Sequence, residues 1–399
     1  MILIILPVII LCVFSFVEFL FPYQERLRIQ VYRLAFFISY FIVAIKYCYG
    51  PDIALYIPLF ENVETPNFIL KNGTQFKDFE IGYVMLCSIA KYIGCSYWFF
   101  SFLITTLYFY TIAKLLKRIE KYKTFALFLI VLFDCNMLFF QFRETVAVSF
   151  FILSFLAYSD KKYFKYIILT ILAIFTHKSA VFACLLTFFA FNINQLRATK
   201  RNYIVILICL LLFAFISIKD VILGIISYLP LDETTVKSIE FHIQVERRQQ
   251  TIFFVYFFAI YCLYYYGLSQ KKDSFSVPVL IFFLIVVLFY QNWYLLSRFR
   301  SYFMPIVIVY VIKELDNQIN KNKLYKQLLV VTLYAFCFFF CRGIIKSYQK
   351  SESKILKSTT IFSLTEKTEE EIKEASMQKA SVFWKYDNSN LVTDEKKER

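Results

Sequence analysis

Apolar segments long enough to cross a lipid bilayer recur along almost the whole chain, and this pattern limits the possible fold more than any other feature. A transmembrane helix needs about 20 largely apolar residues, and within hydrocarbon a helix satisfies all of its own backbone polar groups. We therefore predict an all-α fold, a polytopic integral membrane helix bundle with about twelve transmembrane helices. The candidate spans are 1–21, 30–48, 97–116, 124–142, 145–159, 163–177, 178–192, 203–218, 251–267, 277–297, 301–313 and 326–345.

The composition agrees with a membrane protein. Of the 399 residues, 59% are hydrophobic, whereas soluble domains average about 45–50%. The aromatic content of 21% fits aromatic belts at the two membrane interfaces. The ten cysteines include no C-x-x-C pair, and most sit singly in apolar runs, so we interpret them as unpaired thiols rather than as a disulfide framework or a metal site.

The net charge of +15 does not indicate a nucleic-acid partner, because of where the charges lie. Residues 346–399 hold 11 basic and 10 acidic residues, which leaves +14 on residues 1–345. In that part Lys and Arg form short clusters between apolar segments, as in cytoplasmic loops. A basic face on a folded soluble module, which nucleic-acid binding requires, is not visible.

Every second loop carries one of these basic clusters, and this alternation predicts the topology. With the clusters inside, the N-terminus and the loops 49–80 and 219–250 lie outside. We predict a polytopic membrane domain over 1–345 and a charged hydrophilic C-terminal tail over 346–399, which an even number of crossings places outside. The basic clusters lie at 26–33, 114–123, 161–165, 197–201, 271–272 and 313–326.

Residues 81–95 are apolar but do not fit this alternation. Only one crossing is allowed between the outer loop 49–80 and the basic cluster near Lys117. We therefore predict an outer re-entrant or interfacial helix near 81–95. Irregular backbone at membrane depth must line a polar cavity or be covered by protein, so this segment indicates a site nearby.

Ionisable residues gather beside the apolar segments on the predicted outer side. Such residues are costly at membrane depth and are usually functional. The planar guanidinium of Arg binds phosphate bidentately, so the set predicts an anion-binding cavity that opens outward. The residues are Lys46, Asp52, Glu80, Arg143, Glu144, His177, Lys178, Glu240, His242, Glu246, Arg247, Arg248, Arg298 and Arg300.

Each of these residues also has a purely structural interpretation. Arg143 and Arg298 can extend to lipid headgroups, and the pair Arg143–Glu144 can be a weak interfacial ion pair. His177 closes an apolar run, and Asp52 follows a proline in a turn. Their shared side of the membrane is what favours the functional interpretation.

Several blocks occur in an order that resembles the EpsG/Wzy-type bacterial exopolysaccharide (O-antigen-like) polymerases, over roughly residues 30–315. The family has an Arg where this chain has Lys46, followed by Gly, Asp and Tyr, which here are Gly50, Asp52 and Tyr56. The blocks are 46-KYCYGPDIALY-56, 79-FEIGYVML-86, 141-QFRETVAVSFFIL-153, 175-FTHKSAVFA-183 and 298-RFRSYFMP-305.

The resemblance implies a multi-pass enzyme of the bacterial plasma (inner) membrane. Such polymerases transfer a growing glycan from undecaprenyl pyrophosphate to a sugar hydroxyl of another lipid-linked repeat unit at the outer face, without a cofactor or metal. A chain-length regulator and a flippase are the implied protein partners.

The implied site combines a base with cationic side chains. His177 is the expected base, because a neutral imidazole accepts a proton near pH 7, while Asp52 and Glu80 are rival bases or sugar ligands. Arg143 and Arg298 are expected to stabilise charge on the departing pyrophosphate. The expected substrate-binding residues are Lys46, Asp52, Tyr56, Glu80, Arg300, Arg247 and Arg248.

Other classes of membrane protein stay open at this stage. A lipid-linked glycan flippase or other transporter is also a helical bundle, but no internal repeat is visible and the charges gather at one face instead of the midplane. A membrane acyltransferase uses a histidine, normally with a cytosolic donor, whereas His177 is predicted outside. An O-antigen-type ligase shares the chemistry and differs in its acceptor, and a purely structural scaffold has no need of so many embedded Arg.

Overall fold

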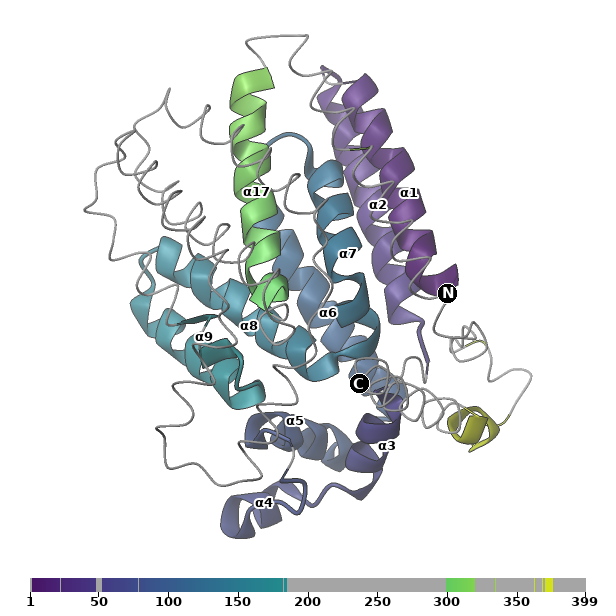
Figure 1. Cartoon of the computed structure of the whole chain (residues 1–399), viewed down its shortest axis with the longest axis vertical. Coiled ribbons are helices and arrows are strands. Elements are labelled where there is room, and N and C mark those ends of the chain that lie inside the picture. The colour runs from purple at the N-terminus through teal and green to yellow at the C-terminus, as the bar shows by residue number, and fades with distance from the viewer. Residues whose placement is uncertain are drawn as a thin grey trace, which may run out of the picture. The chain divides into compact units, whose positions relative to one another are not determined.

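All regular elements in the described part of this computed structural model are helices, with no strand among them (Figure 1). The structure describes residues 2–21, 23–47, 52–77, 79–181, 183–184, 299–319, 334, 362, 368 and 370–375. The helices are α1 (Ile2–Leu20), α2 (Glu25–Ala44), α3 (Ile53–Asn62), α4 (Pro66–Asn72), α5 (Ile81–Tyr92), α6 (Tyr97–Leu116), α7 (Lys123–Phe140), α8 (Phe142–Ser159), α9 (Tyr163–Thr176) and α17 (Phe299–Ile319).

For the part of the chain described by the structure, the prediction of an all-helical membrane protein is confirmed. Within the described residues, α2, α6 and α8 are long and apolar enough to cross a bilayer, by length and composition. The sequence predicts a span over 97–116, the bounds of α6, and one over 163–177, which differs from α9 by a residue. The predicted spans between 185 and 298, and the outer loop 219–250, lie outside the described residues, so the count of about twelve crossings stays a prediction.

The chain divides into two compact units, which we describe separately. The first comprises Met1–Lys117, Tyr122–Lys178 and Leu328–Arg399, and the second Arg118–Lys121 and Ser179–Gln327. In the second unit, Lys121 Nζ lies 3.0 Å from Asp316 Oδ1 of α17. The candidate site belongs to the first unit.

A buried carboxylate joins α1 to the start of α7. Glu18, near the end of α1, is 2% exposed, and its Oε2 accepts hydrogen bonds from the backbone N–H groups of Thr124 and Phe125, at 3.0 and 3.1 Å. These N–H groups belong to the first turn of α7, where no partner exists within the helix. Glu18 therefore caps α7 from a neighbouring helix.

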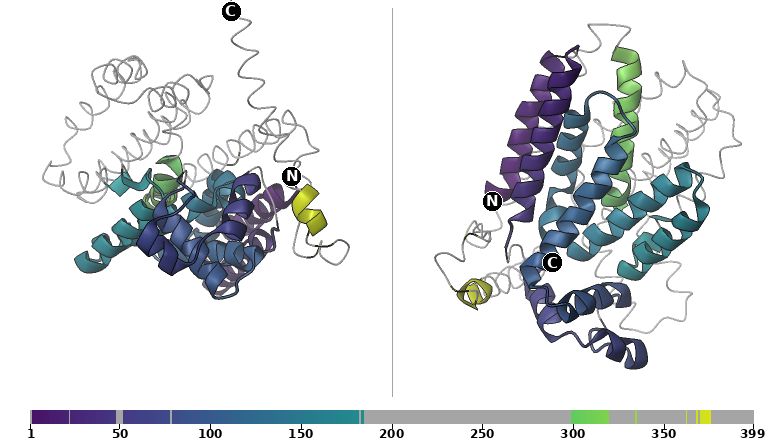
Figure 2. Two further views of the ribbon diagram at one scale, coloured as in Figure 1. Left: turned by 90° about the horizontal axis from the view of Figure 1, so that it is seen from below. Right: turned by 180° about the vertical axis from the view of Figure 1, so that it is seen from behind.

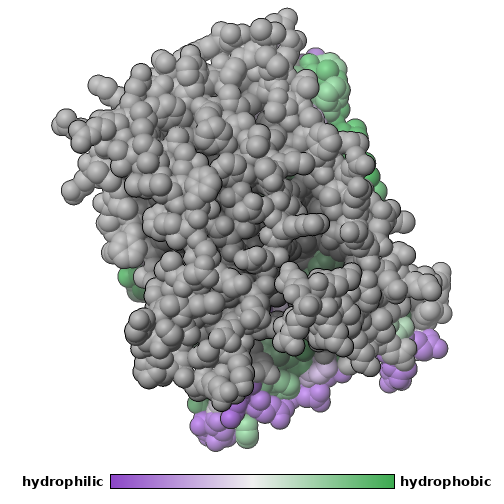
Figure 3. Space-filling model, viewed as in Figure 1, coloured by the Kyte–Doolittle hydropathy of each residue, from purple (hydrophilic) through white to green (hydrophobic). Residues whose placement is uncertain are grey.

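Three short helices, α3, α4 and α5, lie between α2 and α6 in the chain, and we call them the outer assembly because the sequence predicts them on the outer side. Helices α3 and α4 both pack on α5, which also contacts the end of α9 (Figure 2). Figure 3 shows hydrophilic surface at the lower end, where these helices lie, and hydrophobic surface along the upper right edge. With 12 residues, α5 is about 18 Å long, too short for a hydrocarbon core of about 30 Å. It therefore has the size expected of the half-helix or interfacial helix predicted near 81–95.

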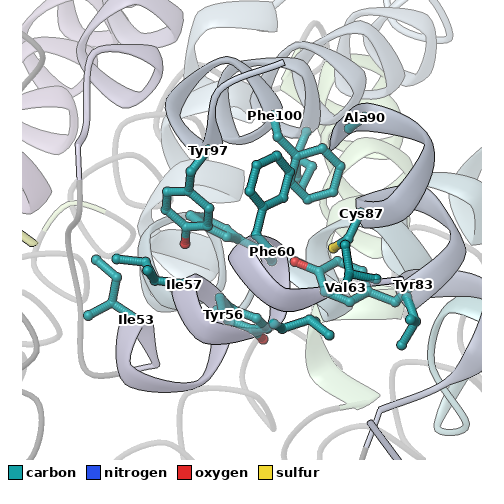
Figure 4. Packing of buried hydrophobic residues seen from close by; sticks show 14 of the residues in the cluster. Ile53, Tyr56, Ile57, Phe60, Val63, Tyr83, Cys87, Ala90, Tyr97 and Phe100 are labelled. Carbon is teal, nitrogen blue, oxygen red and sulfur yellow. The ribbon is translucent and has the colours of Figure 1, made fainter. Parts of the chain in front are cut away.

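An aromatic core holds this outer assembly on the ends of α6 and α8. Tyr56 stacks on Phe142, with ring centroids 5.5 Å apart, and Phe60 stacks on Phe100 at the same distance. Figure 4 shows these α3 side chains among residues of α5 and α6. The buried cluster comprises Tyr47, Ile53, Tyr56, Ile57, Leu59, Phe60, Val63, Ile69, Tyr83, Val84, Cys87, Ala90, Tyr97, Phe100, Ile104, Phe142, Val146 and Ile372.

A single non-helical residue, Gln141, separates α7 from α8. Its φ of −109° and ψ of 72° break the helix, and α8 begins at the next residue. The hydroxyl of Thr145 lies 3.1 Å from the carbonyl oxygen of Met137 and 2.9 Å from that of Gln141, so it links the two helices. This break places the first turn of α8 beside the outer assembly.

Candidate active site

Three side chains from distant parts of the sequence meet where the outer assembly contacts α8 and α9. Glu80 is the residue before α5, with extended backbone at φ −67° and ψ 135°. Arg143 is the second residue of α8, and His177 follows the last residue of α9. The sequence predicts all three on the outer side, and in the structure Arg143 and His177 both contact Glu80.

The carboxylate of Glu80 is the centre of this contact. Its Oε1 lies 2.9 Å from Nδ1 of His177 and accepts the backbone N–H of Lys178 at 3.1 Å. Its Oε2 accepts a hydrogen bond from Nη1 of Arg143 at 2.9 Å. The side chains of Glu80 and His177 are each 10% exposed and that of Arg143 is 23% exposed, so the cluster is largely shielded and Arg143 is its most exposed member.

These partners keep Glu80 ionised. Burial by itself raises the pKa of the carboxyl, but the hydrogen bond from His177, the charges of His177 and Arg143 and the Lys178 N–H outweigh it and lower the pKa to about 2. A carboxylate with so low a pKa is a weak proton acceptor near pH 7. Glu80 is therefore a fixed anion, which weakens its case as a rival base.

The ionised carboxylate also determines the tautomer of His177. A carboxylate only accepts hydrogen bonds, so Nδ1 of the imidazole must carry the proton that it donates to Glu80. In neutral imidazole the other nitrogen, Nε2, then holds a lone pair. His177 is thus oriented by Glu80 in the way that carboxylates orient catalytic histidines in other enzymes.

Arg143 is held by an aromatic ring as well as by Glu80. The carbon Cζ of its guanidinium lies 4.8 Å from the ring centroid of Phe79, the residue before Glu80. A cation over a ring face within about 6 Å is attracted to it. Arg143 also acts on buried Tyr56 by charge and hydrogen bonding, which opposes the rise in the pKa of that phenol caused by burial and by the charge of Asp52.

A glycine allows Glu80 to approach His177. A Cβ atom at Gly82 would lie 2.5 Å from the carbonyl oxygen of Phe175 and 2.9 Å from its Cβ, closer than real Cβ atoms come to backbone. The start of α5 can therefore pack directly on the last turn of α9 only because residue 82 has no side chain. Neither this role of Gly82 nor that of Phe79 was recognised from the sequence, although a glycine near the start of an apolar helix, in a chain with only 7 glycines, is a usable signal.

Lys46 lies at the junction of α7 and α8, close to this site. It is 3% exposed, and its Nζ donates to the carbonyl oxygen of Leu138 at 2.5 Å and to Oγ1 of Thr105 at 3.2 Å. Leu138 is in the last turn of α7, so the ammonium satisfies an orphan carbonyl at the negative end of that helix. The same Nζ lies 4.9 Å from the ring centroid of Phe142, next to Arg143. This geometry fits a role in positioning the α7–α8 junction.

The other predicted site residues fall in different environments. Asp52 is the residue before α3, where its carbonyl accepts the backbone N–H groups of Leu55 and Tyr56. Tyr56 is 5% exposed and belongs to the aromatic core. Arg300 lies in the first turn of α17, in the second unit, and only its backbone is described. Arg247, Arg248 and Arg298 lie outside the described residues.

The arrangement supports proton transfer and anion binding. It offers one oriented imidazole, one guanidinium with five N–H donors and one carboxylate that neutralises part of their charge. In the part of the chain that the structure describes, no group of three or more His, Cys, Asp or Glu side chains is placed to hold a metal ion.

Comparison with known proteins gives one match. A family model described as the EpsG family matches residues 29–355, which include all three residues of the cluster. No curated protein and no solved structure matches the chain.

Gly82→Ala tests the close approach of α5 to α9. The added methyl group must displace the backbone at Phe175, and we expect a lower thermal midpoint of the purified protein together with a loss of activity. Alanine is favoured over glycine in a helix by about 1 kcal/mol, so without the clash the variant would be more stable than wild type. Val13→Ile, which adds one carbon to an exposed residue of α1, is the control and should change neither property. A raised midpoint with full activity for Gly82→Ala would contradict the packing described.

The depressed pKa of Glu80 predicts a pH-dependent stability. Because the folded state lowers this pKa from 4.5 to about 2, the ionised carboxylate contributes stability above about pH 4.5, and this contribution is lost as the pH falls toward about 2. Glu80→Gln should therefore be less stable than wild type at pH 7, by at most about 3 kcal/mol. Thermal midpoints of the two proteins in detergent, measured from pH 7 down to pH 3, should approach each other as the pH falls, with part of the difference remaining until about pH 2. The exposed control Glu374→Gln should follow wild type throughout, and a gap between Glu80→Gln and wild type that is constant with pH would contradict the assignment.

Proposed function

The chain belongs to the EpsG family, and on this premise we propose that it is a membrane polysaccharide polymerase. The proposed reaction transfers a growing glycan from undecaprenyl pyrophosphate to a sugar hydroxyl of another lipid-linked repeat unit, at the outer face of the bacterial plasma membrane. The observation that carries this proposal is the contact of Glu80 with both His177 and Arg143. It joins an oriented base to a cation at the side predicted to face the lipid-linked substrates.

In the proposed mechanism His177 accepts the proton of the acceptor hydroxyl. The hydroxyl oxygen forms a bond to the anomeric carbon of the donor glycan, and its proton moves to Nε2 of the imidazole. Glu80 holds Nδ1–H, so Nε2 has the lone pair that this step requires. The negative charge of Glu80 also stabilises the imidazolium that forms.

Arg143 acts on the leaving group in this proposal. As the new bond forms, the bond between the anomeric carbon and the pyrophosphate oxygen breaks, and its electron pair leaves with undecaprenyl pyrophosphate. A guanidinium already held by Glu80 and Phe79 needs little reorganisation to stabilise that charge. Its planar donors match phosphate oxygens bidentately, which a lysine ammonium does not.

The remaining cationic residues complete the proposed substrate site. We propose that Arg298, Arg300, Arg247 and Arg248 bind the pyrophosphate groups of the two lipid-linked substrates, and that Asp52 contributes to sugar binding. The chemistry needs only these side chains and the two substrates, so the proposal includes no cofactor. A flippase that delivers the repeat units and a chain-length regulator are the proposed protein partners.

The role of His177 as a base gives the main prediction. Purified protein in detergent, supplied only with lipid-linked repeat units, should produce polymer. His177→Ala and His177→Gln should both reduce turnover by about 10²–10⁴-fold, the usual loss of a general base. Lys162→Gln, at an exposed residue of the predicted basic loop and away from the cluster, is the control and should retain turnover near wild type. If His177→Gln keeps most of its turnover, hydrogen bonding rather than proton transfer is its role.

The same assay distinguishes a polymerase from a ligase. A ligase transfers glycan to a different final acceptor, so it should form no polymer when lipid-linked repeat units are the only substrate. If folded wild-type protein forms no polymer in this assay, the proposed function itself is wrong.

A second prediction concerns the shape of the Arg143 side chain. Arg143→Lys retains a charge that can pair with Glu80 but loses the planar fork for phosphate. Losing a charge-assisted hydrogen bond of about 1.5–3 kcal/mol predicts a reduction of kcat/KM by about 10–100-fold. Arg33→Lys on the exposed surface of α2 is the matched control and should have no effect. If Arg143→Lys has the kcat/KM of wild type, the role of Arg143 is purely structural, as an ion-pair partner of Glu80.

A further inference from the structure

A short helical turn in the C-terminal tail is encoded by its own sequence. Residues 370–375 are helical, and Thr368 and Glu371 form a reciprocal capping pair at its start. The backbone N–H of Thr368 donates to Oε2 of Glu371 at 2.9 Å, and the N–H of Glu371 donates to Oγ1 of Thr368 at 3.3 Å. This exchange is the capping box that starts many helices.

The turn contributes an apolar side chain to the core of the outer assembly. Ile372 is 2% exposed and belongs to the buried cluster formed mainly by α3, α5 and α6. The burial of Ile372 is a specific contact, because the neighbouring residues Glu371 and Glu374 are exposed. The tail helix thus has one buried face.

An ion pair fixes where this face docks. Nζ of Lys373 lies 2.6 Å from Oε1 of Glu61 in α3. With Glu61 45% and Lys373 23% exposed, the pair is near the surface and sets register more than it adds stability. Figures 1 and 2 show the yellow helical turn at the same end of the molecule as α3.

These contacts constrain the topology of the tail. A hydrocarbon core of about 30 Å cannot separate two residues that share an ion pair, so the tail helix and α3 lie on the same side of the membrane. The alternation of basic loops predicts that α3 faces outward. We propose that the C-terminal tail is returned to the outer face and docks on α3 through Ile372 and Lys373, as a component of the assembly that carries Glu80.

Cysteine labelling in intact cells tests the side of the tail. In a functional background without native cysteines, the exposed positions Glu374→Cys, Asn62→Cys and Lys162→Cys are compared with a membrane-impermeant maleimide. We expect Glu374→Cys to react in intact cells as readily as Asn62→Cys of the outer loop, whereas Lys162→Cys of the basic loop reacts only after lysis. Reaction of Glu374→Cys only after lysis would overturn the proposal.

The rate of labelling tests the docking itself, without reference to activity. In purified full-length protein, Ile372→Cys should react at least about 10-fold more slowly than Glu374→Cys, since its side chain is in the core. Adding Glu61→Lys, which places two cations at the ion pair, should raise the rate at position 372 and leave that at 374 unchanged. Equal rates at the two positions in the protein with Glu61 intact would show that the tail does not dock.

Discussion

The ionised carboxylate of Glu80 holds together the ends of the helices that meet at the candidate site. It accepts hydrogen bonds from the side chains of Arg143 and His177 and from the backbone of Lys178. Removing a carboxylate from water costs free energy unless it gains hydrogen bonds, and these three donors supply them. The start of α5, the start of α8 and the end of α9 are therefore fixed to one another by one side chain. The same bonds fix the imidazole tautomer and the position of the guanidinium, so structure and proposed chemistry depend on the same group.

Much of the helical architecture follows from the sequence, because hydrocarbon leaves few alternatives for an apolar stretch. The predicted span 97–116 is α6, and the segment 81–95, assigned to an outer helix by parity, contains α5. The separation of the predicted spans 124–142 and 145–159 is explained by Gln141, whose backbone breaks the helix between α7 and α8. Basic loops also suggested that Glu80, Arg143 and His177 share one side. Their pairing could not be predicted, because it depends on packing between α5 and α9 at Gly82, where a missing side chain decides the distance.

Lys46 and Tyr56 illustrate a second difficulty, which is that one residue type can serve more than one role. A basic residue at the end of a span suggests an anion ligand, yet an ammonium also satisfies the last carbonyls of a helix, as Lys46 does at Leu138. The family resemblance implies that Tyr56 binds substrate, yet its ring packs against those of Tyr83 and Phe142. Both residues adjoin the candidate site, so their substitution would change activity through the position of Arg143. Distinguishing contact from positioning therefore requires the structure.

The contact between Lys373 and Glu61 has a consequence for how the protein is made. These residues are 312 positions apart in a chain of 399 residues. Protein synthesis proceeds from the N-terminus at about 5–20 residues per second, so α3 leaves the ribosome tens of seconds before its tail partner exists. During that interval the pocket for Ile372 is open, and truncated products never close it. Premature termination near the end of the message would thus leave an apolar gap that quality-control proteases and chaperones can detect.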